Sequence, residues 1–110
     1  MTADDVRRLA LALPETTEKI AWGTPAFYVR KKFFCRIRDE GHTLVARVDM
    51  GERALLMGAE PDIFFITPHY ANWGGVLVHL AAIEEDELRE VLTDAWLIAA
   101  PKRLAATLEM

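Results

Sequence analysis

Apolar and polar residues alternate between Phe27 and Val48, and this period of two predicts two consecutive β-hairpins. The second hairpin is expected to turn at residues 39–42, where polar residues and a glycine interrupt the alternation. One set of side chains then faces the core: Phe33, Cys35, Ile37, Leu44, Ala46 and Val48. The other set faces away from it: Phe34, Arg36, Arg38, Val45 and Arg47. A sheet face that mixes arginines with aromatic residues is the strongest functional signal in the chain.

The first hairpin is expected to close through a three-residue loop, Arg30-Lys31-Lys32. This loop length pairs Val29 with Phe33 and sets Tyr28 beside Phe34 on the outer face. Both hairpins then agree about which face is buried, and such agreement specifies the register of the strands.

Helical spacing of apolar residues marks two further stretches. The first begins with a capping-box sequence at Thr2 and stops at Pro14. The second, residues 84–99, opens with acidic residues that complement a helix dipole. The other expected elements are a connector over residues 15–24, a short helix starting at Asp49, a central strand over 63–66, a loop over 68–75, a strand over 76–79 and a last turn or helix over 102–108. This order predicts an α+β fold, a two-layer sandwich with helices packed on one face of an antiparallel sheet.

Composition adds a domain count and an uneven charge. A chain of 110 residues with 52% hydrophobic residues predicts a single domain, residues 1–110, that needs no metal or disulfide to fold. The net charge is −4, which argues against a protein that coats nucleic acid indiscriminately. Residues 28–47 nevertheless carry six basic and two acidic residues, so this segment alone would attract phosphate.

The lone cysteine and the N-terminus indicate a cytoplasmic protein. Cys35 has no partner for an internal disulfide, and its place on the apolar face favours a buried, reduced thiol over a nucleophile. The first residues are acidic and lack the basic and apolar regions of an export signal. No apolar run approaches the ~20 residues of a membrane span, so no membrane association is expected.

Short motifs spread along the chain resemble the MmcQ/YjbR family. They are Leu13-Pro14-Glu15-Thr16-Thr17-Glu18, Trp22-Gly23-Thr24-Pro25-Ala26-Phe27, Lys32-Phe33-Phe34-Cys35-Arg36, Thr67-Pro68-His69-Tyr70, Ala95-Trp96 and Ala100-Pro101-Lys102-Arg103-Leu104. The resemblance implies a CyaY-like fold and the family's proposed "double wing" DNA-binding role, in which β-hairpins project as wings. Many members carry His-x-Asn-Lys before a tryptophan. Here His69-Tyr70-Ala71-Asn72-Trp73 lacks the lysine, so no role of that lysine is carried over.

The first functional hypothesis is weak, salt-dependent binding of DNA or other nucleic acid. Under it, Arg36, Arg38 and Arg47 contact phosphates, and Arg30, Lys31 and Lys32 form the wing tip. Tyr28 and Phe34 would stack on an unpaired base. The plainer interpretation is a solvated face, on which arginine stems cover the apolar residues and nearby carboxylates neutralise the charge.

The second hypothesis is a module that binds a small molecule or a peptide. Its pocket would be lined by Trp22, His69, Tyr70, Asn72 and Trp73, which suit a flat or anionic ligand. In the plainer interpretation the two tryptophans close one end of the core, and the histidine and asparagine bond loop backbone. A protein-binding adaptor is a third candidate, and an apolar patch left exposed after folding would distinguish it.

Catalysis and cofactor binding find little support in the sequence. His42, His69 and His79 lack the spacing of metal ligands, and the single cysteine has no partner. No Gly-rich phosphate loop, nucleophile elbow or dinucleotide fingerprint is present. We therefore expect a protein that is not an enzyme and holds no metal or cofactor. The sequence does not define the oligomeric state, and a monomer is favoured.

Overall fold

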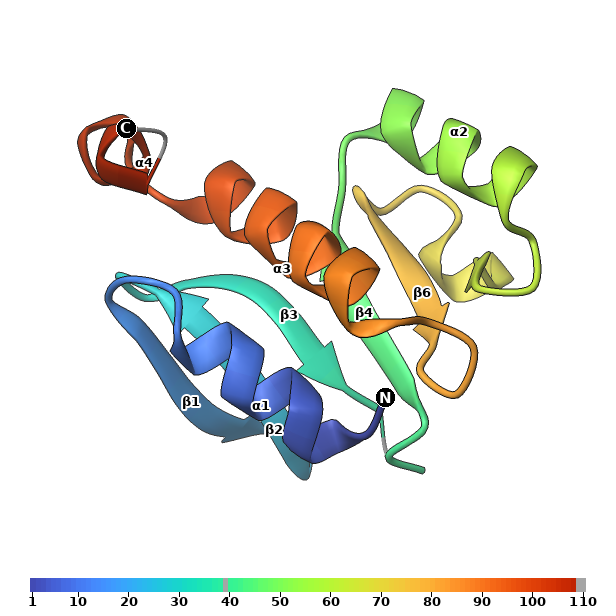
Figure 1. Ribbon diagram of the computed structural model, residues 1–110, viewed down its shortest axis with the longest axis horizontal. Helices are drawn as coiled ribbons and strands as arrows, with labels where there is room; N and C mark the ends of the chain where they lie inside the picture. The colour runs from blue at the N-terminus through green and yellow to red at the C-terminus, as the bar shows by residue number, and fades with distance from the viewer. Residues whose placement is uncertain (39, 109–110) are drawn as a thin grey trace.

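An antiparallel sheet of six strands, in the order β1-β2-β3-β4-β6-β5, organises the described part of the chain (Figure 1). The structure is a computed structural model, and it describes residues 1–38 and 40–108. Its elements are α1 (Ala3–Leu11), β1 (Thr16–Ala21), β2 (Thr24–Val29), β3 (Lys32–Ile37), β4 (Thr43–Arg47), α2 (Met50–Ala59), β5 (Phe64–Phe65), the 3₁₀ turn η1 (Pro68–Tyr70), β6 (Gly75–His79), α3 (Glu85–Ala99) and α4 (Lys102–Leu108). The expected α+β class with an antiparallel sheet is confirmed.

The core lies between the sheet and the helices α1 and α3, which cover one of its faces (Figure 1). The predicted capping box starts α1, since Thr2 and Asp5 bond each other's backbone N–H groups. The apolar stripe of α3 is buried, and Trp96 in the last turn of the helix donates its indole N–H to the Pro14 carbonyl at 3.0 Å. This stripe is therefore used by the core and is not available to a partner. The other sheet face is called the open face below.

The segment expected as a connector, residues 15–24, contains the edge strand β1. It joins β2 through a two-residue turn, Trp22-Gly23, in which both residues have positive φ, 53° and 81°. Such a type I′ turn matches the twist of the two strands, and glycine suits its second position. Because β1 is a mostly polar edge strand, TTEKIA, apolar alternation did not reveal it.

A second correction concerns residues 63–66, expected as a central strand. Their strand, β5, has two residues and lies at the other sheet edge.

The β2–β3 hairpin differs from its prediction by one residue. Arg30 and Lys31 alone form the turn, with φ values of 46° and 71°, so Val29 pairs with Lys32 and Tyr28 with Phe33. A β-bulge then leaves Phe34 without a partner before Phe27 pairs with Cys35.

The bulge changes which aromatic ring is buried. Phe34 and Cys35 are both fully buried, whereas Phe33 lies on the open face with its ring 5.9 Å from that of Tyr28. The predicted core position of Phe33 and outer position of Phe34 are therefore interchanged. The β3–β4 pairing is as expected, with Arg36 opposite Val45 and Cys35 opposite Ala46.

Acidic side chains of α2 and α3 face one another beside the sheet. A hydrogen bond with Glu60 at the end of α2, followed by partial burial and repulsion from Glu60 and Glu90, raises the pKa of Glu87 to about 7. Burial, followed by repulsion from Glu52 and Glu90, raises the pKa of Asp94 as well. The contact between the two helices is thus most favourable when Glu87 is protonated.

The positive φ at Lys31 predicts a gain in stability on substitution by glycine. K31G relieves the left-handed strain of a side chain at φ 71° and should raise the free energy of unfolding by about 1 kcal/mol. The matched control is K32G, which removes the same side chain one residue later, inside β3, and should lower stability by roughly 0.5–1 kcal/mol. Urea unfolding of both variants measures the difference. Equal effects of the two substitutions would contradict the turn assignment.

The raised pKa of Glu87 predicts that stability falls as the solution becomes alkaline. The folded protein holds this proton more tightly than the unfolded chain does, so its contribution is complete in acid and is lost as the pH rises through about 7. E87Q keeps a neutral, hydrogen-bonding side chain and should lose most of this slope in urea unfolding between about pH 5 and pH 7, the window between the ordinary and the raised pKa of this carboxyl. The control E84Q removes a charge from an exposed position at the same end of α3 and should keep the wild-type slope. An unchanged slope in E87Q would show that this carboxyl is not responsible.

Candidate functional site

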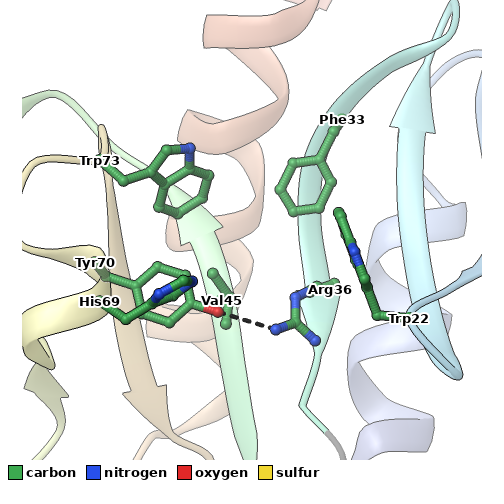
Figure 2. A pocket seen from close by; sticks show the side chains of 7 residues that line it. All are labelled: Trp22, Phe33, Arg36, Val45, His69, Tyr70 and Trp73. Atoms are coloured by element: carbon green, nitrogen blue, oxygen red, sulfur yellow. Dashed lines mark hydrogen bonds between the residues drawn. The ribbon is translucent and has the colours of Figure 1, made fainter.

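A cavity of about 570 Å³ opens on the open face of the sheet (Figure 2). Its lining consists of Trp22, Phe33, Arg36, Val45, His69, Tyr70 and Trp73. Figure 2 shows two aromatic walls, with Trp22 and Phe33 on one side and Tyr70, His69 and Trp73 on the other. In this view Arg36 and Val45 lie between the two walls. The cavity is therefore a slot with aromatic sides and one guanidinium group.

The first wall, Trp22 and Phe33, is positioned by the β1–β2 turn and by the β-bulge at Phe34, neither of which the sequence pattern predicted. The turn between β1 and β2 carries Trp22, a residue that is 76% exposed and whose ring centroid lies 5.4 Å from the Arg36 guanidinium carbon. Phe33 and Arg36 are three residues apart in β3, and a regular strand would place them on opposite faces. The bulge at Phe34 brings both to the open face.

The second wall is a loop, residues 67–74, which hydrogen bonds from the side chain of Arg53 in α2 hold in place. This guanidinium donates to four backbone carbonyls: Ala71 at 2.9 Å, Trp73 at 3.0 Å, Gly75 at 3.2 Å and Tyr70 at 3.3 Å. The loop has little regular structure of its own, and one side chain thus satisfies several of its acceptors. Arg53 is a positioning residue for this wall, and no sequence pattern pointed to it.

Trp73 is held in place by its contacts on three sides. Its ring centroid lies 5.7 Å from that of Tyr70 and 6.0 Å from that of Phe33, which links the two walls. Its ring also packs directly on Gly75, where a Cβ atom would overlap the indole and lie 2.7 Å from the Ala46 carbonyl oxygen. Gly75 is therefore needed for the close approach of the tryptophan to β6.

Arg36 is held by neutral groups. Its Nη2 donates to the Tyr70 hydroxyl at 2.9 Å, and its Nη1 lies 3.4 Å from both Thr24 Oγ1 and the Ile37 carbonyl oxygen. No carboxylate of the described residues lies within 4.0 Å of this half-buried guanidinium. A guanidinium has five N–H donors, so donors remain for a ligand in the cavity.

The cations predicted to contact nucleic acid differ in whether a carboxylate lies beside them. Arg30 donates to both carboxylate oxygens of Glu15, at 2.8 and 3.0 Å, and Arg38 lies 3.9 Å from Glu40. The predicted cations that have no described carboxylate within 4.0 Å are Lys31, Lys32, Arg36 and Arg47. The six cations predicted to contact nucleic acid therefore do not form one continuous surface of unpaired positive charge.

The two aromatic residues predicted to stack on a base also differ. Phe34 has no exposed surface, so it cannot stack on a ligand, and the bulge explains its burial. Tyr28 is half-buried on the open face, with the Lys19 ammonium 5.6 Å from its ring centroid. Only one of the two rings is thus accessible.

The predicted ligand pocket agrees better with the geometry. Trp22 is distant in sequence from His69, Tyr70 and Trp73, which share one loop, and the structure gathers all four around one cavity. Asn72 is exposed and does not line it. Sequence reasoning missed Phe33, because the bulge changes its face, and also Val45, which it had placed on the outer face without a role.

Other reactive groups lie outside the cavity. Cys35 is fully buried, and burial raises the pKa of its thiol well above the ordinary value, so it is a poor nucleophile. Within residues 1–38 and 40–108, no group of three or more histidine, cysteine or acidic side chains is arranged to hold a metal ion. In the same residues, no helix has both the length and the apolar character needed to cross a membrane.

The contact between Gly75 and Trp73 predicts a specific effect of one methyl group. G75A forces the indole away from β6 and should lower the free energy of unfolding by roughly 1–3 kcal/mol. It should also shift the indole N–H NMR signal of Trp73. The control is G74A, whose new Cβ would make an ordinary contact, 3.8 Å from the Val48 carbonyl oxygen. Equal stability of the two variants would contradict the close packing of Trp73 on Gly75.

Comparison with known proteins identifies the family. The YjbR family model matches residues 11–98. Proteins of Mycobacterium bovis and Mycobacterium tuberculosis, described as uncharacterized, are 36% identical over 118 residues, covering 94% of this chain and 92% of theirs. The crystal structure of a Deinococcus radiodurans protein with a DUF419 domain shares the fold, with a TM-score of 0.79 and 21% identity over 99% of this chain and 88% of that one. The resemblance noted in the sequence motifs is thus confirmed, and this chain belongs to the YjbR family.

Proposed function

We propose that this protein binds a small planar ligand whose edge carries anionic or carbonyl oxygens, and that it does so without catalysis. The observation that carries the proposal is the half-buried guanidinium of Arg36 between two aromatic walls, with no described carboxylate beside it. Trp22 and Phe33 on one side and Tyr70 and Trp73 on the other would contact the faces of the ligand.

Electrostatics favours an oxygen-rich ligand edge at Arg36. A partly buried charge that meets only neutral groups is less stable than one paired with an anion. Hydrogen bonds from a guanidinium to a carboxylate or phosphate are about twice as strong as those between neutral groups. The cavity volume of about 570 Å³ lies within the ordinary range of small-molecule sites.

Binding is a simpler proposal than catalysis because the lining supplies few reactive groups. Among the described residues, the lining contains one imidazole, that of His69, whose side chain is exposed and whose ring packs edge-on against Tyr70 with centroids 4.9 Å apart. Within residues 1–38 and 40–108, neither a carboxylate nor a thiol lines the cavity.

A second candidate is DNA binding by the cationic hairpins. It is favoured by Lys31 and Lys32 at the β2–β3 turn, which are exposed and have no described carboxylate within 4.0 Å. The burial of Phe34 and the pairing of Arg30 with Glu15 leave this candidate with fewer contacts than its six cations suggested.

The three tryptophans give a site-resolved test of the cavity. We expect 2-naphthoate to shift the indole N–H NMR signals of Trp22 and Trp73, which line the cavity, and to leave that of Trp96 in the core unchanged. A neutral analogue, 2-naphthalenemethanol, should bind less tightly because it lacks the carboxylate. A panel of other aromatic carboxylates and of nucleobases extends the test to further oxygen-rich edges.

Substitution of Arg36 provides the decisive comparison. R36M keeps an apolar stem but no donors and should weaken binding of the panel's ligands about tenfold or more, since a hydrogen bond to a charged group contributes about 1.5–3 kcal/mol. R38M removes the same charge from the same β-hairpin outside the cavity and should bind as the wild type does. If no member of the panel shifts Trp22 and Trp73 selectively, or if R36M binds as tightly as R38M, the proposal is wrong.

A further inference from the structure

A second hollow, of about 480 Å³, adjoins the aromatic cavity. Its lining consists of Lys32, Phe33, Arg47, Trp73 and Gly74. Phe33 and Trp73 line both spaces, so the two hollows meet across these rings. A ligand held in the cavity would extend into the second hollow without leaving the protein surface.

The second hollow is cationic. Lys32 is exposed and Arg47 is half-buried, and neither has a described carboxylate within 4.0 Å. Arg47 also borders the crevice between α2 and α3, whose carboxylates include Glu87 and Glu90, yet it forms no ion pair with either. Both cations are therefore available to an anion that enters between them.

The sheet register fixes the spacing between the two sites. Arg36 lies directly opposite Val45, and Arg47 is two residues further along β4 on the same face. Diagonal neighbours of this kind have Cα atoms about 7–8 Å apart. A five-membered sugar spans a comparable length between a planar base and a phosphate.

From these features we infer that the ligand is a nucleoside phosphate, an inference that rests on the proposed function of the cavity. The base lies between the aromatic walls, with its carbonyl edge toward the unused donors of Arg36. The sugar crosses Phe33 and Trp73, and the phosphate lies between Lys32 and Arg47. The nucleotide is either free in solution or an unpaired residue of a single strand, because both present the same groups.

Comparison of nucleosides with their 5′-monophosphates tests the phosphate site separately from the cavity. Binding of all four ribonucleoside monophosphates is measured by the shifts of the Trp22 and Trp73 indole N–H signals. We expect the monophosphate that binds most tightly to bind at least about tenfold more tightly than its own nucleoside. The double variant K32A/R47A should reduce that advantage to about twofold while leaving nucleoside binding unchanged. The control K31A/R38A removes the same net charge from positions outside both hollows and should keep the full advantage.

Two further ligands distinguish the sources of the nucleotide. A single-stranded oligonucleotide that binds more tightly than the monophosphate identifies a strand, and one that binds no more tightly identifies the free nucleotide. Either result supports the inference. Duplex DNA should shift Trp22 and Trp73 less than the single strand does, since a paired base cannot enter the slot.

Failure of this inference is distinguishable from failure of the proposed function. Equal binding of nucleoside and monophosphate, or an equal loss in K32A/R47A and K31A/R38A, would overturn the phosphate site. The inference would also be overturned if nucleotides bind without shifting the indole N–H signals of Trp22 and Trp73, or if duplex DNA binds as tightly as the single-stranded oligonucleotide. In each case, selective shifts by 2-naphthoate and their loss in R36M would still support the cavity.

Discussion

One extra residue in β3 determines how the sheet serves both the core and the cavity. The bulge at Phe34 lets two consecutive side chains, Phe34 and Cys35, face the helices. Residues on either side of them, Phe33 and Arg36, consequently share the open face although they are three positions apart. Without the bulge, strict alternation would bury one of these two side chains or turn one core residue outward. The aromatic wall and its guanidinium therefore depend on this local irregularity.

The opposite wall depends on a different constraint, the attachment of an irregular loop to a helix. Arg53 of α2 donates to four carbonyls of residues 70–75, and Gly75 admits the ring of Trp73 against β6. Tyr70 then reaches Arg36 at 2.9 Å and joins the two walls. The cavity is thus assembled from parts that are separately fixed, and a ligand would find most of it already formed.

Sequence reasoning succeeded where periodicity or a local motif was sufficient. The capping box at Thr2, the buried stripe of α3 and the β3–β4 register all follow from residues close in sequence. It failed at the β2–β3 hairpin because Phe33, Phe34 and Cys35 are all apolar, so alternation alone does not say which two are buried. The turn length decides this, and Arg30-Lys31 lacks the asparagine or glycine that usually marks a two-residue type I′ turn.

The same limit explains which site residues were found. Trp22, His69, Tyr70 and Trp73 were grouped because aromatic and polar side chains in loops suit a pocket, and the structure does bring them to one cavity. Arg53 could not be found in this way, since its partners are backbone carbonyls that lie 17 to 22 residues further along the chain. Long-range contacts to backbone leave no pattern in side-chain chemistry.

The arginines of the hairpins indicate where a ligand would be attracted on an acidic protein. With a net charge of −4, the body as a whole repels anions, so attraction depends on cations that carboxylates have not neutralised. Arg30 and Arg38 lie beside Glu15 and Glu40, whereas Arg36 and Arg47 have no described carboxylate within 4.0 Å. These two line adjoining hollows that share aromatic walls. Of the hairpin cations without a described carboxylate within 4.0 Å, three therefore line the adjoining hollows (Lys32, Arg36 and Arg47), a distribution that suits a compact ligand better than an extended polyanion.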